Sequence, residues 1–167
     1  MDSRDRRARA VRRRFVPVAA GALALALAAC DRAATAPQVA PSVRINEVVL
    51  EDPATGALIY SHMDHWHGFP IVPDGGTLTL RKFFTAFSAH PDDHDPPSRG
   101  DWISLDSLPA EINTRIVASD TTVLRAVGTR VQMQLTGRRT ASTPVSMVVR
   151  RATTTLYEAP PLNAVVR

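Results

Sequence analysis

The chain has 167 residues, with 20 Lys and Arg against 16 Asp and Glu and a formal net charge of +4. Seven of the arginines lie in residues 1–29, so the other 138 residues hold 13 basic and 14 acidic side chains and carry a net charge of −1. Without a basic face to neutralise many phosphates, the chain is not expected to bind nucleic acid. The 138 residues suffice for one domain with its own core.

Residues 1–29 have the organisation of a secretory signal peptide, in which an arginine-rich region precedes an apolar run from Val16 to Ala29. The run is shorter than the roughly 20 residues that a membrane-spanning helix needs. It ends in Leu27-Ala28-Ala29-Cys30, which resembles the lipobox of bacterial lipoproteins. This resemblance implies that residues 1–29 are removed, that Cys30 is lipidated, and that the membrane is a partner through this lipid.

Cys30 is the single cysteine of the chain, so it cannot form an internal disulfide. The implied location is the bacterial cell envelope, with the protein exported to the periplasmic or surface face. The alternative is a leader cleaved elsewhere, with no role for Cys30. Residues 30–42 are rich in Ala, Pro and small polar residues and predict a flexible tether, followed by a folded domain at 43–167.

From Val43 onward, short β-favourable runs alternate with turn signals, and no stretch shows a helical period. The segments 43–51 and 57–62 flank the turn sequence DPATG and predict a hairpin. A longer strand is expected at 77–89, where the alternation shifts phase at Phe83-Phe84 and indicates a bulge or burial on both faces. A proline-containing polar loop is expected at 90–100. Further strands are expected at 101–106, 111–119, 121–127, 130–137, 143–151, 153–159 and 162–166.

These strands predict an all-β fold, a single antiparallel sandwich, because an open sheet would leave one apolar face in water. Val131, Met133 and Leu135 would share one face, as would alternate residues of the strand at 143–151. The stretch LTGRRTASTPVSMVV also resembles the last strands of bacterial immunoglobulin-like domains. That resemblance implies an immunoglobulin-like sandwich.

All five histidines lie between residues 62 and 94, as His62, His65 and His67, then His90 and His94. Residues two apart on an extended strand share a face, so the rings of His65 and His67 can converge on one ion. His62 would point to the opposite face of a regular strand and can join them only if the chain bends near Met63-Asp64. His90 and His94 flank Pro91-Asp92-Asp93, where a turn could bring both rings to one side.

Neutral imidazole is a good ligand for borderline divalent cations, and the pattern therefore predicts a site for a divalent transition metal. Zn²⁺ is the default ion, with Cu²⁺ or Ni²⁺ as alternatives, because no cysteine is available to the site. Oxygen ligands, or acceptors for imidazole N–H groups, could come from four carboxylates: Asp64, Asp92, Asp93 and Asp95.

The leading functional hypothesis is a lipid-anchored envelope protein that binds this metal for capture, buffering or handover to an envelope transporter or receptor. One alternative is a structural or adhesive immunoglobulin-like module at the cell surface that has no metal function. Another is a metal-dependent hydrolase, with Asp64 or Glu51 as general base. The histidine spacing matches no metalloprotease motif, so a non-catalytic role is favoured.

Overall fold

The computed structural model describes residues 43–86 and 95–167, which belong to one compact unit, Ser42–Arg167. This part of the chain is all β, as predicted, apart from two 3₁₀ turns, η1 (Arg99–Asp101) and η2 (Leu105–Ser107). Neither turn is long and apolar enough to cross a bilayer, and no other helix occurs in these residues. The strands are β1 Glu47–Glu51, β2 Leu58–His62, β3 His65–His67, β4 Ile71–Val72, β5 Thr77–Thr85, β6 Ile112–Ala118, β7 Leu124–Gly128, β8 Gln132–Gly137, β9 Ala141–Arg151, β10 Thr154–Glu158 and β11 Leu162–Val166.

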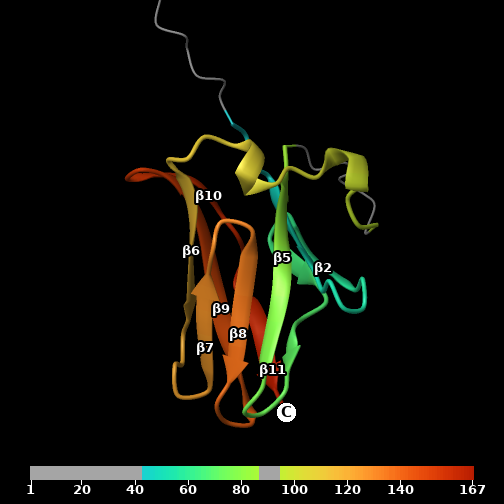
Figure 1. Ribbon diagram of the computed structural model, residues 1–167, viewed down its shortest axis with the longest axis vertical. Helices are drawn as coiled ribbons and strands as arrows, with labels where there is room; N and C mark the ends of the chain where they lie inside the picture. The colour runs from blue at the N-terminus through green and yellow to red at the C-terminus, as the bar shows by residue number, and fades with distance from the viewer. Residues whose placement is uncertain (1–42, 87–94) are drawn as a thin grey trace, which may run out of the picture. The chain divides into compact units, whose positions relative to one another are not determined.

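Two sheets pack face to face as a β-sandwich (Figure 1). Sheet A has the strand order β3-β2-β1-β5-β8-β7, and sheet B has the order β10-β9-β11-β4 with β6 on the other side of β9. The sandwich prediction is confirmed, but its purely antiparallel form is wrong, because β4 and β11 pair in parallel. β4 has only two residues and follows a turn at Gly68, where φ is positive. It runs in the same direction as β11, whereas a strand that returned in a hairpin would run in the opposite direction.

β10 and β11 are two parts of one interrupted strand along the same edge of β9. Both run antiparallel to β9, and the pairing shifts by one residue between Thr155 and Tyr157 and again before Leu162. Pro160 and Pro161 fall at the second shift, where they supply no N–H to the ladder. The carbonyl of Pro160 is thereby available to accept a hydrogen bond from the Trp66 indole, at 2.6 Å.

Side chains from both sheets form one continuous apolar core. The inward residues of sheet A alternate with outward ones, as in β8, where Met133 and Leu135 are fully buried. In sheet B, Val145, Met147 and Val149 supply the facing layer from β9, as the alternation predicted. The predicted hairpin at 43–62 is also present, since Glu51 pairs with Leu58 across a turn held by Asp52, whose carboxylate accepts from Ala54 N at 2.9 Å.

The predicted strand at 101–106 is wrong. Ile103 makes one isolated bridge to Phe84, and the chain then enters η2, whose N-cap is Ser104. This segment instead covers the outer face of sheet A, where Trp102 packs on Phe83 with ring centroids 4.9 Å apart. Phe84 lies in the core, so the phase shift at Phe83-Phe84 reflects burial on both faces of β5 and not a bulge.

Candidate metal centre

The pairing register places four polar side chains in a row across the outer face of sheet A. His65 of β3 lies opposite His62 of β2, and Glu47 of β1 lies opposite Thr85 of β5. Val49 pairs with Tyr60, so in the same register Glu47 falls beside His62. Side chains that pair directly across neighbouring strands share a face and lie close together. The row sits where β1 begins and β5 ends, at the end of the sandwich away from the C-terminus (Figure 1).

The bend that His62 requires is present. Met63 and Asp64 form a two-residue turn between β2 and β3, with Met63 in the left-handed region at φ 49°. Reversing the chain at this point brings His62 onto the same face as His65 and His67. The ring centroid of His62 lies 5.8 Å from that of His65 and 6.1 Å from that of His67.

His65 and His67 converge as the two-residue spacing predicted. Their Nε2 atoms are 3.1 Å apart and their ring centroids 4.8 Å apart. The carboxylate of Asp64 lies 3.1 Å from Nδ1 of His65 and lowers its own pKa by accepting this hydrogen bond. A carboxylate only accepts, so Nδ1 is the protonated nitrogen and Nε2 of neutral His65 holds the lone pair directed at His67. Asp64 therefore accepts a hydrogen bond from the ring N–H of His65. This is one of the two roles predicted for Asp64.

Two residues of this row, Glu47 and Thr85, were not expected from the sequence, and Glu47 is the one that contacts a histidine. Glu47 is buried, with 2% of its surface exposed, and its Oε1 lies 3.2 Å from Nδ1 of His62, which is also buried. Oε2 accepts a longer hydrogen bond, 3.4 Å, from the hydroxyl of Thr85. A buried carboxylate needs such partners because its desolvation is unfavourable. The signal that could have revealed Glu47 is the hairpin register, which sets it beside His62.

Tyr60 adds an aromatic wall to the cluster. Its ring stacks on His67 with centroids 4.7 Å apart and an interplanar angle of 13°. Burial raises the pKa of Tyr60, and the negative charges of Asp95 and Glu47 raise it further. Asp95, one of the predicted carboxylates, thus acts electrostatically on Tyr60.

The structure thus brings together His62, His65, His67 and Asp64. His90, His94, Asp92 and Asp93 lie outside the described residues. Within residues 43–86 and 95–167, no three His, Cys, Asp or Glu side chains are arranged to hold a metal ion as they stand. Glu51, considered above as a general base, is instead ion-paired with Arg99, whose Nη2 lies 2.6 Å from its Oε1.

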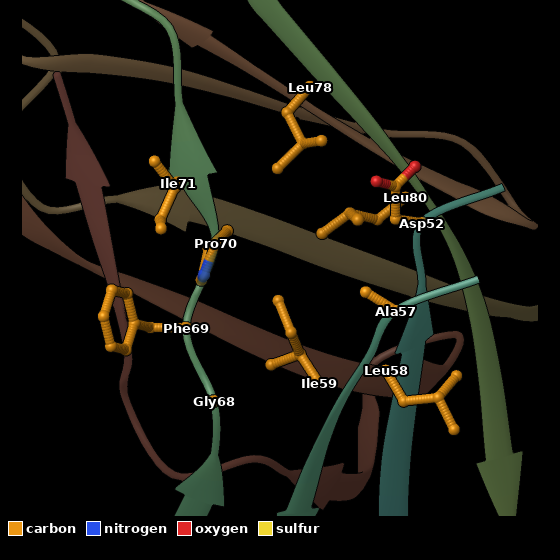
Figure 2. Close-up of a pocket in the computed structure, with 10 residues that line it drawn as sticks. All are labelled: Asp52, Ala57, Leu58, Ile59, Gly68, Phe69, Pro70, Ile71, Leu78 and Leu80. Carbon is orange, nitrogen blue, oxygen red and sulfur yellow. The ribbon is translucent and has the colours of Figure 1, made fainter. Parts of the chain in front are cut away.

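A separate groove of about 330 Å³ opens between β4 and the β1–β2 hairpin (Figure 2). Ile59, Ile71 and Leu78 surround it, and Asp52 supplies its one charged group. Phe69, which is 53% exposed, points away from Ile59. The groove is apolar and contains no histidine, so it is a different kind of site from the histidine cluster.

Comparison with known proteins gives no family assignment. No family model matches the chain, and no curated protein matches it. Among solved structures, the crystal structure of the S-layer protein SbsC domains 4 and 5 is similar at a TM-score of 0.35 and 8% identity. The match covers 73% of this chain and 65% of that chain, so this protein spans less than two thirds of the length of its structural neighbour.

Proposed function

We propose that the protein binds a divalent transition metal, with Zn²⁺ as the first choice, through the β2–β3 hairpin. The observation that supports this proposal is the 3.1 Å separation between Nε2 of His65 and Nε2 of His67. Two imidazoles that share one tetrahedral ion at Zn–N distances of 2.0–2.1 Å have their ligating nitrogens roughly 3.3 Å apart. The pair thus needs only a small adjustment to act as two ligands.

The surroundings of this pair also suit an exchangeable ion. The side chain of His65 is 46% exposed, so an ion can reach the pair from solvent. No cysteine lies in the hairpin, so no thiolate is available there, and the imidazole donors favour Zn²⁺, Cu²⁺ or Ni²⁺. An accessible ion on a surface hairpin fits capture, buffering or handover to an envelope transporter or receptor better than a permanently enclosed structural site. His90 and His94 remain predicted ligands.

Replacing both His65 and His67 by Ala is expected to weaken Zn²⁺ binding at least tenfold, because the variant loses both converging nitrogens. Calorimetric titration of the full-length chain measures the effect. The same titration should show weaker wild-type binding at lower pH, since protonated imidazole has no lone pair to donate. Met63→Ala is the matched control, because Met63 is 58% exposed in the same hairpin. Equal Zn²⁺ affinity in the wild type and the double variant would contradict the proposal.

The proposal includes attachment to the cell envelope through a lipid on Cys30. Its support is the signal-peptide-like organisation of residues 1–29 and the lipobox-like sequence Leu27-Ala28-Ala29-Cys30. Cys30→Ser is expected to move the protein from the membrane pellet to the soluble fraction of an expressing bacterium, because the residue that carries the lipid is lost. Fractionation followed by immunoblotting tests this. Membrane association that is unchanged in Cys30→Ser would rule out the lipid anchor.

A further inference from the structure

The buried pair of Glu47 and His62 extends the hairpin site inward, and the inference drawn from it rests on the proposed metal binding. Nδ1 of His62 lies 3.2 Å from Oε1 of Glu47. Because the carboxylate can only accept, Nδ1 of His62 carries the proton, and Nε2 is the nitrogen with a lone pair. Metal-binding histidines commonly have this arrangement, with the second ring N–H donated to a carboxylate.

The ring positions agree with a set of three imidazoles. Three imidazoles on one tetrahedral ion, at the bond length usual for Zn²⁺, have their ring centroids about 5 Å apart. The observed separations are 4.8 Å for His65 and His67, 5.8 Å for His62 and His65, and 6.1 Å for His62 and His67. The His62 ring therefore lies about 1 Å farther from the other two rings than in such a set, and it must move inward by about that distance to join them.

We propose that His62 is the third metal ligand and that Glu47 is its positioning residue, which holds His62 in the Nδ1–H tautomer with Nε2 directed toward His65 and His67. The hairpin would then supply three histidines to the ion, and a fourth coordination position would be available to a further ligand. Glu47 is suited to this role because it sits on β1, between β2 and β5 in sheet A, and is almost completely buried. A buried side chain in a central strand holds a fixed direction better than a loop residue would.

The test compares Glu47→Gln with Glu51→Gln in the full-length chain. Both residues are buried glutamates on the outer face of β1, but Glu51 pairs with Arg99, away from the histidines. Glu47→Gln is expected to weaken Zn²⁺ binding 10- to 100-fold, and Glu51→Gln is expected to leave it unchanged. His62→Gln should weaken binding at least as much as Glu47→Gln. The d–d absorption of bound Co²⁺ should change from a four-coordinate to a higher-coordinate spectrum in both site variants.

A measurement on the metal-free protein shows whether a variant is altered at the site or simply folds poorly. Long-range ¹⁵N–¹H NMR of the wild type should show His62 protonated at Nδ1, and Glu47→Gln should disturb this tautomer while the signals of His65 stay unchanged. If Zn²⁺ binds the wild type, is lost in the double variant of His65 and His67, and is unaffected by Glu47→Gln and His62→Gln, this inference is overturned and the proposed function stands. If the wild type does not bind Zn²⁺, both are overturned.

Discussion

Arg130→Met is expected to lower the free energy of unfolding by about 3 kcal/mol, because one guanidinium holds together the segment that leads into β6. Nη1 of Arg130 donates to the carbonyls of Ala110 at 3.0 Å and Ile112 at 2.7 Å. Nη2 reaches three more carbonyls of the same segment, those of Leu105, Leu108 and Pro109. Hydrogen bonds from a charged donor contribute more than neutral ones, and the variant would leave several carbonyls without a protein partner.

The donors of Arg130 act as a set, so the effects of removing them are not additive. Arg130→Lys keeps the charge but offers three donors in place of the planar fork, and it should fall between the wild type and Arg130→Met. Arg138→Met is the matched control, since Arg138 donates a single bond of 2.9 Å to the carbonyl of Thr121 and lies at the surface. Urea unfolding followed by tryptophan fluorescence gives the free energies. A loss for Arg130→Met no larger than that for Arg138→Met would show that the segment does not depend on this side chain.

Alternation and turn chemistry were enough to predict most of the fold. The predicted hairpin at 43–62 and the alternating face of Met133 and Leu135 both appear in the structure. The strand prediction at 101–106 was wrong because the alternating pattern of this segment reflects packing onto sheet A and a single bridge at Ile103. Local sequence cannot distinguish this arrangement from a strand paired along its length. The parallel pairing of β4 with β11 also could not be predicted, since it joins segments more than 90 residues apart in the chain.

In the candidate site, too, features that depend on neighbouring residues were predicted, and features that depend on the pairing of distant strands were not. The convergence of His65 and His67 follows from their spacing, and it was predicted. The place of His62 depended on whether Met63-Asp64 would turn, and Glu47 required the register of β1 against β2. Lys82 lies in the interior although its side chain is charged, and the sequence analysis did not place it there. Its hydrogen-bond partners, Thr114 and Thr129, are 32 and 47 residues away in the chain, so local sequence could not reveal them.

Lys82 is expected to make the stability of the protein depend on pH in the alkaline range. The residue is fully buried, and its ammonium group donates to Thr114 Oγ1 and, at 2.6 Å, to the carbonyl of Thr129. Burial lowers the pKa of Lys82 from 10.5 to about 8. Below pH 8 both the folded and the unfolded chain bind the proton, and the unfavourable burial of the charge is fully present. Between about pH 8 and 10.5 the unfolded chain binds more protons than the folded one, so the free energy of unfolding rises with pH.

The size of this effect follows from the pKa difference, which corresponds to about 3 kcal/mol between the two ends of the range. Lys82→Met removes the titrating group and keeps an unbranched side chain that is one atom shorter, so the stability of the wild type relative to this variant should increase by that amount from pH 7.5 to 10.5. Tyr60 and Tyr157, whose pKa values are raised by burial, titrate in both proteins, and their effects cancel in the difference. Urea unfolding of both proteins at several pH values provides the measurement. If the difference in free energy of unfolding between the two proteins stayed constant with pH, burial would not lower the pKa of Lys82. Its hydrogen bonds to Thr114 and Thr129 would then be sufficient to solvate the buried ammonium group.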